Sequence, residues 1–303
     1  MSAAPEQRSN PDARQGVGAL LTGYTLWGVF PIYFRALQAI PAPLIIAYRM
    51  VLCCVVVLVW LRLRGELSSV RAALVDPSSR RRLATTAVLI SVNWLVYVWA
   101  VSQGRVVEAS LGYFITPLLN VVLGVVVLRE RLRSLQSAAV VLAALGVGYL
   151  TWQLGCPPYI ALVLALSFST YGLLRKTVAA EALSGLAAET LLLTPLGAAY
   201  LVWMESRGQG AFARATPMQL GLLMCSGAIT ALPLWLFSFG ARRVSLATLG
   251  LVSYLSPTLQ FLVGVYFFQE HFDPHRLVGF TCIWCGLILY SADAVLARPQ
   301  GQQ

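Results

Sequence analysis

The sequence predicts an all-α integral membrane protein whose ten transmembrane helices form two inverted five-helix repeats around a central cavity. Three observations lead to this prediction: an apolar composition, an uneven placement of positive charges, and a proline-bearing motif that occurs twice. Of the 303 residues, 58% are apolar and only 11% are charged, and the mean hydropathy is +0.74. A soluble domain carries roughly 25% charged residues, so a chain of this composition belongs in a lipid bilayer.

The first five predicted spans are separated by polar or charged segments. A helix needs about 20 apolar residues to cross a hydrocarbon core of ~30 Å, and runs of this length begin near residue 16. We place the first repeat at 16–152, after a cytoplasmic tail at 1–15, with spans at 16–37, 43–61, 83–103, 107–128 and 134–152. The segments LRLRGELSSVRAALVDPSSRRR and RERLR, which follow the second and fourth spans, are too charged to lie in lipid.

The second half of the chain repeats this organisation. We place the second repeat at 157–296, before a cytoplasmic tail at 297–303, with spans at 157–175, 182–203, 217–240, 245–268 and 276–296. The breaks are GCPP before the sixth span, ESRGQGAFARATP after the seventh and QEHFDPH after the ninth. The sequence leaves no room for a separate soluble domain.

The positive charges give the orientation. With ten spans, sixteen of the 22 Lys and Arg residues fall on the side of both termini, five fall on the other side, and Arg49 lies within a span. Cytoplasmic loops carry an excess of Lys and Arg, so we expect both termini to be cytoplasmic. The net charge of +10 is therefore a topology signal rather than a sign of nucleic-acid binding.

The repeated motif indicates an internal duplication. SLGYFITPLLN at 110–120 and TLGLVSYLSPTLQ at 248–260 share a Ser/Thr-Leu-Gly start, a Tyr, a Pro and a side-chain amide. An offset of 140 residues maps Pro117 to Pro257 and Asn120 to Gln260. Because five spans is an odd number, the second copy must enter the membrane from the opposite side. Inverted repeats of this kind are typical of alternating-access transporters, with a substrate site between the halves, although a duplication kept for helix packing alone would leave the same pattern.

Two charged residues are predicted to lie within spans. Arg49 and Glu189 are each about seven residues into their spans, and the offset of 140 makes them counterparts of opposite charge. A charge at that depth costs several kcal/mol unless it is paired or hydrated. We expect both side chains to face the central cavity, where they pair or bind substrate. The alternative is that Arg49 reaches the outer interface and Glu189 bonds to a neighbouring helix.

Other polar and aromatic residues are candidates to line the cavity. Amides inside spans either contact substrate or bond helix to helix, and aromatic rings at mid-span suit an organic substrate or a cation. The candidate substrate-binding residues, besides Arg49 and Glu189, are Asn93, Trp94, Tyr113, Asn120, Trp235, Tyr254 and Gln260. Pro117 and Pro257 each remove a backbone donor, so we expect hinges there, or simple kinks.

Several site types are missing from the sequence. It contains no metal-ligand cluster, no phosphate-binding glycine loop and no nucleophile–base pair, so we expect no cofactor, no bound metal and no enzymatic activity. Glu108 and Glu189 are the candidate proton carriers near the membrane interior. The expected partners are a small-molecule substrate, protons as a coupling ion, and membrane lipid, whereas the oligomeric state is not encoded in any recognisable way.

Several segments resemble one known family. AYRM, NWLVYVWAV, EASLGYFITPLLNVVLGVVVLRERLR and TLGLVSYLSPTLQFLVGV are similar to segments of the RarD proteins, in the EamA branch of the drug/metabolite transporter superfamily of bacterial inner membranes. The resemblance covers nearly the whole chain. It implies spans 1–4 and 6–9 around a central cavity, with spans 5 and 10 at the periphery. The chain departs from the family at Thr116, where a side-chain amide is expected, and at Gln269, where Gly is commoner.

These observations predict an inner-membrane secondary transporter, or permease, that exports a small organic metabolite or drug by alternating access. One alternative is a passive channel or facilitator, and detecting exchange between inside and outside substrate pools would favour a carrier. A second is an intramembrane enzyme acting on lipid, which needs the nucleophile or metal site that the sequence lacks.

Overall fold

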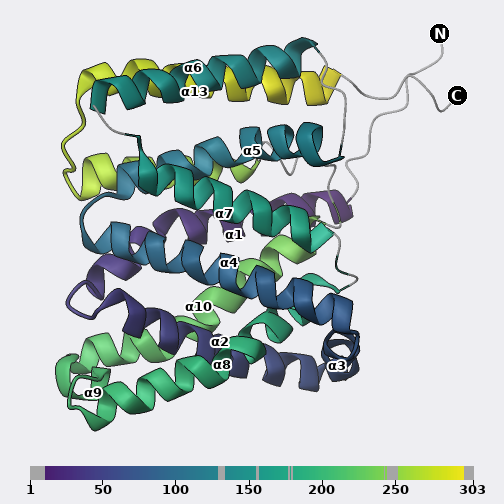
Figure 1. The fold of residues 1–303 in the computed structure, drawn as a ribbon, viewed down its shortest axis with the longest axis vertical. Helices are drawn as coiled ribbons and strands as arrows, with labels where there is room; N and C mark the ends of the chain where they lie inside the picture. Colours follow the sequence, from purple (N-terminus) through teal and green to yellow (C-terminus); the bar gives the residue numbers. More distant parts are fainter. Residues whose placement is uncertain are drawn as a thin grey trace, which may run out of the picture.

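The computed structural model describes residues 11–128, 134–154, 157–176, 178, 180–241, 243 and 252–296. All regular structure within them is helical (Figure 1). The helices are α1 (Pro11–Ala36), α2 (Ala42–Leu63), α3 (Leu67–Val75), α4 (Pro77–Ser102), α5 (Val106–Leu128), α6 (Ser134–Leu154), α7 (Tyr159–Lys176), α8 (Ala182–Ser206), α9 (Ala211–Arg214), α10 (Pro217–Ala241), α12 (Leu255–Leu262), the π-helix η1 (Val263–Phe267) and α13 (Pro274–Leu296).

The long helices occupy the predicted span positions. Six of them, α1, α2, α4, α6, α8 and α10, are long and apolar enough to cross a membrane. Shorter apolar segments lie within α5, α7, α12–η1 and α13, at the four other predicted positions. The chain is therefore an all-helical, multi-pass membrane protein, while the count of ten spans stays a prediction.

Helix boundaries differ from the predicted spans where capping extends a helix into a polar segment. Pro11 begins α1 inside the predicted tail, because proline suits the first helical position and Asp12 lies in the first turn. Likewise, α4 begins at Pro77, six residues before the predicted span. The Asp76 carboxylate caps it by accepting from Ser79 N at 2.8 Å. The short helices α3 and α9 lie in segments predicted only as breaks.

The ninth predicted span, 245–268, is described only from residue 252. There α12 continues directly into η1, a five-residue π-helix of the kind often found at functional sites. Gln269 follows with φ of 54°, in the left-handed region that favours glycine. Glycine would adopt this conformation without strain.

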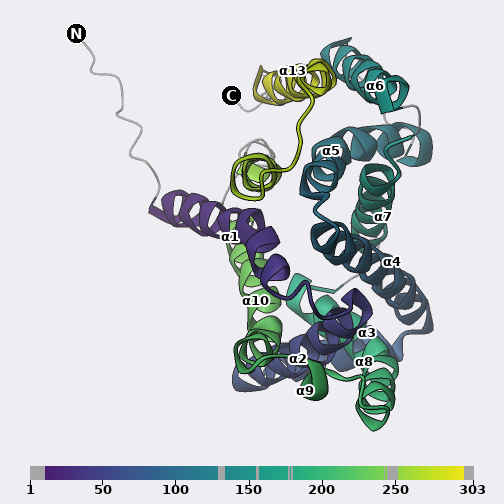
Figure 2. The same cartoon turned by 90° about the vertical axis from the view of Figure 1, so that its left-hand side faces the viewer.

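Successive long helices run in alternate directions between two ends of the bundle (Figure 1). We call the end where α1 begins and α13 ends the terminal end, and the opposite end, where α1 joins α2, the loop end. At one edge α6 packs against α13 (Figures 1 and 2). Glycine makes that contact close, since a Cβ on Gly146 would lie 2.7 Å from the Gly279 carbonyl oxygen.

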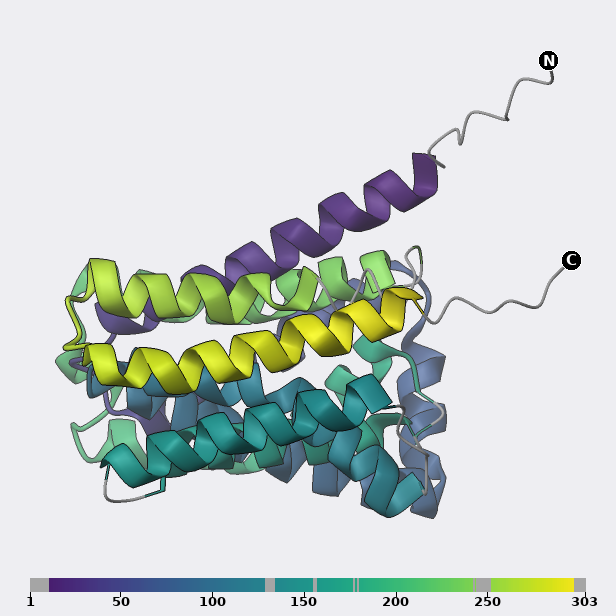
Figure 3. The ribbon, with the colours of Figure 1, turned by 90° about the horizontal axis from the view of Figure 1, so that it is seen from above.

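The two ends of the bundle are packed differently. Towards the loop end, one continuous buried apolar cluster joins α1, α2, α4, α5, α7, α8 and α10, with Phe34, Leu37 and Ile45 among its fully buried members. A second cluster joins α5, α6, α7, α12 and α13, and a third joins α2, α3, α4, α8 and α10 near the terminal end. Figure 3 shows the first half of α1 diverging from the bundle towards the terminal end.

Candidate functional site

Arg49 lies inside the bundle, near the start of α2 and towards the loop end. Only 4% of the residue is exposed. Its guanidinium carbon lies 4.1 Å from the ring centroid of Trp94, 5.5 Å from that of Phe34 and 5.8 Å from that of Phe30. Aromatic faces attract a cation at these distances. The three rings come from α1 and α4, so the positive charge is held where three helices meet.

A hydroxyl group supplies the hydrogen bond that Arg49 makes within the described part of the chain. Its Nε donates to Thr230 Oγ1 of α10 at 2.7 Å, and Thr230 Oγ1 donates in turn to the Ser226 carbonyl oxygen at 2.8 Å. Among the described residues, no carboxylate contacts the guanidinium group. The charge is therefore stabilised by rings and a neutral hydroxyl rather than by a counter-ion.

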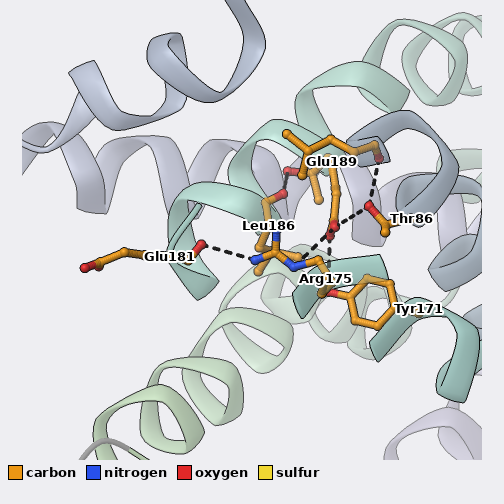
Figure 4. A network of polar contacts seen from close by, with 8 residues as sticks. Thr86, Tyr171, Arg175, Glu181, Leu186 and Glu189 are labelled. Atoms are coloured by element: carbon orange, nitrogen blue, oxygen red, sulfur yellow. Dashed lines mark hydrogen bonds and ion pairs between the residues drawn. The ribbon is translucent and has the colours of Figure 1, made fainter. Parts of the chain in front are cut away.

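Glu189 lies in the other half of the bundle, near the start of α8, and is 1% exposed. Its Oε1 lies 3.7 Å from Arg175 Nε and accepts from Thr86 Oγ1 at 2.7 Å. Its Oε2 accepts from the Tyr171 hydroxyl at 3.3 Å. Figure 4 shows these three side chains, from α4 and α7, converging on the carboxylate. The arrangement satisfies a buried charge with one cation and two hydroxyl donors.

Arg175 is a functional candidate that the sequence did not reveal, because its position at the end of the sixth predicted span is typical of a loop charge. It lies in the last turn of α7, and its side chain is 13% exposed. Nη2 donates to the Glu181 carbonyl oxygen at 3.2 Å, and Nη1 is buried without a partner in the described structure (Figure 4). The guanidinium group packs against Gly185, where a Cβ would overlap it. Gly185 lies four residues before Glu189 in α8, and glycine is common in membrane helices, so the sequence gives no clear signal for this contact.

Arg49 and Glu189 do not pair with each other in this structure. Within the described residues, each has its own partners, Thr230 for the arginine and Arg175 with Thr86 for the glutamate. Their separation follows from geometry, since each lies near the start of its helix and α2 and α8 start at opposite ends of the bundle (Figure 1). The two charges form separate clusters, one towards each end.

Asn93 is a structural junction as well as a candidate site residue. It is 1% exposed, and its Nδ2 donates to the Leu164 carbonyl oxygen and to Ser167 Oγ, both at 2.9 Å. Its Oδ1 accepts from the Tyr113 hydroxyl at 3.2 Å. Asn93 therefore joins α4 to α5 and α7, directly beside Trp94 and its contact with Arg49. Three of the predicted residues thus gather with Arg49.

Gln260 lies in α12 and is 3% exposed. Its Nε2 donates to the Trp27 carbonyl oxygen and to Ser256 Oγ, both at 3.2 Å, and its Oε1 is buried without a partner in the described structure. The bond to Trp27 connects α12 to α1. Gln260 thus contacts neither the Arg49 group nor the Glu189 group through a described hydrogen bond.

The remaining predicted residues are dispersed. Trp235 packs on Trp60 of α2, with ring centroids 5.2 Å apart, and Tyr254 packs on the second apolar cluster. Pro257 lies in the first turn of α12, where a missing donor disturbs the helix little. Pro117 and Asn120 lie in helix α5, but their side chains are outside the described residues. Prolines inside α1, α8 and α10 were not singled out from the sequence: Pro31, Pro195 and Pro233.

Two carboxylates lie at the loop end, at the start of α5. Glu270, which follows η1, accepts from Val106 N at 2.7 Å and from Val107 N at 2.9 Å, so it caps this helix from a distant part of the chain. Burial raises the pKa of Glu270 above its ordinary value, and the two backbone donors oppose that rise. Glu108 Oε2 lies 2.6 Å from Arg105 Nη2, so this candidate proton carrier has a partner of its own.

Neither described hollow is lined by Arg49 or Glu189. One, of about 570 Å³, lies between α2, α3, α4 and α8 and is lined by Leu58, Leu67, Val70, Arg71, Leu74, Val75, Arg80 and Leu191. The other, of about 300 Å³, is a shallow apolar depression beside Trp99. Among the described residues, no three His, Cys, Asp or Glu side chains gather as they would around a metal ion.

Comparisons with known proteins identify the family. The model of the EamA-like transporter family matches residues 14–152 and 158–292. An uncharacterized transporter of Vibrio cholerae is 40% identical over 98% of this chain and 97% of its own length. Protein RarD of Escherichia coli K12 is 40% identical over 94% of this chain and 96% of its own. The chloramphenicol-sensitive protein RarD of Pseudomonas aeruginosa is 33% identical over 95% of this chain and 98% of its own.

A solved crystal structure has the same fold. It superposes with a TM-score of 0.60 and covers 94% of this chain and 99% of its own, at 19% sequence identity. Identity this low supports the fold alone, but the full-length relatives and the family model go further, because both match nearly all of the chain. The protein belongs to the EamA-like transporter family, as a RarD-type permease.

Proposed function

We propose that this permease is a secondary transporter that exports a small organic metabolite or drug from the bacterial cytoplasm by alternating access. In this proposal two inverted five-helix repeats, 16–152 and 157–296, enclose a substrate site near the middle of the membrane. Both termini, and thus the terminal end of the bundle, face the cytoplasm, as the distribution of Lys and Arg favours.

One observation carries the proposal: the two buried charges have related surroundings in opposite halves of the bundle. Arg49 on α2 bonds to Thr230 on α10, and Glu189 on α8 bonds to Thr86 on α4. Each pair joins the second span of one proposed repeat to the third span of the other. Reciprocal contacts of this kind are expected of two inverted repeats that share one interior.

The unequal packing of the two ends supports alternating access. The apolar cluster at the loop end joins seven long helices, whereas the cluster near the terminal end, among the described residues, joins α2, α3, α4, α8 and α10 and does not include α1, α5 or α7. The divergence of α1 towards the terminal end agrees with this difference (Figure 3). We infer that the structure corresponds to a cytoplasm-facing state, and that the outward-facing state opens the loop-end cluster.

Glu189 is the proposed proton site. Among the acidic side chains described, Glu189 is the one buried between helices of both proposed repeats. Its carboxylate interacts with Arg175 and accepts hydrogen bonds from two hydroxyl groups. Protonation of the carboxylate would weaken its attraction to Arg175 and free that cation to move. A proton gradient could in this way bias the equilibrium between the two states.

The test is counterflow in proteoliposomes. Vesicles loaded with an unlabelled compound accumulate the labelled compound only if one carrier exchanges inside and outside pools, which a passive pore does not do. The compound panel begins with chloramphenicol, because one relative carries that name, and continues with small organic acids, amines and neutral metabolites. Accumulation that decays when the pools equilibrate is expected, whereas flux without counterflow would favour the channel alternative.

A further inference from the structure

We propose that Arg49 binds the anionic group of the substrate, so that the compound transported is an organic anion, with an aromatic or apolar body and a carboxylate head. This inference rests on the proposed transport function and deepens it. It assigns the substrate class from the chemistry of one buried side chain and its neighbours.

The first argument is that the charge of Arg49 lacks a counter-ion. The ionisable groups that interact with it are Cys53, Tyr33, Tyr113 and Tyr97, all of which are neutral at physiological pH. Two other charged groups in the described structure differ, because Glu189 has Arg175 and Arg105 has Glu108. A buried cation without an anion is unfavourable in an apolar interior, and a ligand carboxylate would supply the missing charge.

The second argument is that hydrogen-bond donors near Arg49 are unused. In the described structure the guanidinium group donates through Nε to Thr230, and no described bond uses Nη1 or Nη2. Only 4% of Tyr97 is exposed, and its hydroxyl is buried without a partner in the described structure. Ser226 Oγ, one turn before Thr230 on α10, is likewise buried and without a partner. Buried donors are normally satisfied, so this group is suited to a ligand with acceptor oxygens.

The third argument concerns the shape of the surroundings. The rings of Phe30, Phe34 and Trp94 lie around the guanidinium group, and the Tyr97 ring is 5.9 Å from that of Phe34. Arginine combines a planar fork that matches a carboxylate with a face that stacks on aromatic rings. An apolar body and a carboxylate head match the chemistry of these side chains, whereas a cationic ligand would be repelled.

A purely structural role for Arg49 predicts different behaviour. If the arginine only joins α2 to α10 through Thr230 and the aromatic rings, its replacement should lower stability without changing which compounds bind. Ligand charge would then be irrelevant to affinity. The decisive quantity is therefore the affinity difference between an acid and its uncharged amide, and the dependence of that difference on Arg49.

The experiment uses full-length protein in lipid nanodiscs and a panel of matched pairs. The acids are benzoate, phenylacetate and indole-3-acetate, each beside its primary amide, with phenyl phosphate to separate carboxylates from phosphate esters. Binding is measured by equilibrium dialysis for wild type, Arg49→Gln, Arg49→Lys and Arg105→Gln. Arg105 is the matched control, since it is partly exposed at the loop end and already paired with Glu108.

We expect at least one acid to bind wild type about tenfold or more tightly than its amide, the size of a charge-assisted hydrogen bond. Arg49→Gln should abolish that preference, Arg49→Lys should retain part of it, and Arg105→Gln should leave it unchanged. The inference is overturned if no acid binds more tightly than its amide, or if Arg49→Gln keeps the preference.

A second measurement covers the case in which Arg49 variants fail to fold. Phenylglyoxal modifies arginine side chains, and peptide mass spectrometry reports the rate at each position of the wild-type protein. The acid that binds should slow modification of Arg49 but not of Arg105, and its amide should slow neither. Equal rates with acid and amide would contradict the inference.

The two proposals can fail separately. Acid binding that depends on Arg49, without counterflow of that acid, would support the anion site and contradict transport. Counterflow of neutral or cationic compounds that is unaffected by Arg49→Gln would support transport and contradict the anion site.

Discussion

Arg49 and Glu189 occupy equivalent places in the two halves of the chain. Arg49 follows Ala42, the first residue of α2, by seven positions, and Glu189 follows Ala182, the first residue of α8, by seven. Because these helices start at opposite ends, the two charges lie about 10 Å in from different ends of the bundle. Each bonds to a threonine of a distant helix, and one difference stands out: Glu189 has a cation beside it, and Arg49 has no anion.

The threonine contacts predict two similar losses of stability. Thr230→Val and Thr86→Val keep the side-chain shape but remove a hydroxyl that bonds to a buried charged group. Hydrogen bonds to charged groups contribute about 1.5–3 kcal/mol, so each variant should lower the free energy of unfolding by about that amount. Thr258→Val is the control, since this hydroxyl is exposed and bonds within its own helix. Reversible unfolding in detergent measures all three, and variants as stable as the control would show that the contacts are unimportant.

The packing of Arg175 on Gly185 predicts that a single methyl group breaks an ion pair. In Gly185→Ala the Cβ would overlap the guanidinium group, which must shift, and we expect the shift to take it away from Glu189. Breaking a buried pair costs about 3–5 kcal/mol, partly offset by the ~1 kcal/mol that alanine gains over glycine in a helix. The matched control is Gly172→Ala, since a Cβ there meets nothing within 4 Å.

Unfolding measurements should separate these two glycine variants clearly. Gly185→Ala should be less stable than wild type by about 2–4 kcal/mol, and Gly172→Ala should be as stable or slightly more so. Equal stability of the two would mean that Arg175 finds another position without losing its interaction with Glu189.

The left-handed conformation of Gln269 predicts a stabilising substitution. Its φ of 54° is strained for a residue with a Cβ but not for glycine. Gln269→Gly should raise the free energy of unfolding by up to about 1 kcal/mol. Loss of the hydrogen bond from Gln269 Nε2 to the Tyr266 carbonyl oxygen reduces this gain. Gln269→Ala removes that bond and keeps the Cβ, so it should be the least stable of the three proteins. The opposite order would contradict the strain argument.

Glu270 predicts a pH-dependent stability. Burial raises the pKa of Glu270 in the folded protein, so its contribution to stability is fully present below the ordinary glutamate value and is lost as pH rises through the raised value. Glu270→Gln keeps one of the two acceptor oxygens that bond to the Val106 and Val107 amides, and it cannot ionise. Wild type should therefore lose stability relative to this variant as pH rises above the ordinary glutamate pKa and through the raised one. Parallel thermal-unfolding curves would contradict the assignment.

The positions of the helices were predictable from the sequence, because apolar runs near 20 residues reflect the lipid environment directly. The start of α4 was not, since the cap formed by Asp76 extends the helix into a charged segment. The side-chain partners of the buried charges were harder to predict than the helix boundaries. Arg175 looked like a loop charge, and its place beside Glu189 depends on the packing of α7 against α8 and on the space at Gly185.

The candidate site was predictable in part. Arg49, Trp94, Asn93 and Tyr113 gather through α2, α4 and α5, and their residue types alone marked them as unusual in lipid. Thr230, Thr86 and Tyr97 were not marked, because hydroxyl groups are common in membrane helices and usually bond within their own helix. Only the arrangement of helices from both halves of the chain shows which hydroxyls meet a charge.

Alternating access is the central claim, and two distances measured on one protein test it most directly. Spin labels at the exposed positions Gln38 and Gln103 report the loop end, and labels at Gln15 and Ser134 report the terminal end. The exposed native cysteines Cys225 and Cys285 are first replaced by serine. In lipid, with and without a bound acid, we expect two populations in which the loop-end distance grows as the terminal-end distance shrinks. A single, unchanging distance at each end under all conditions would contradict the account.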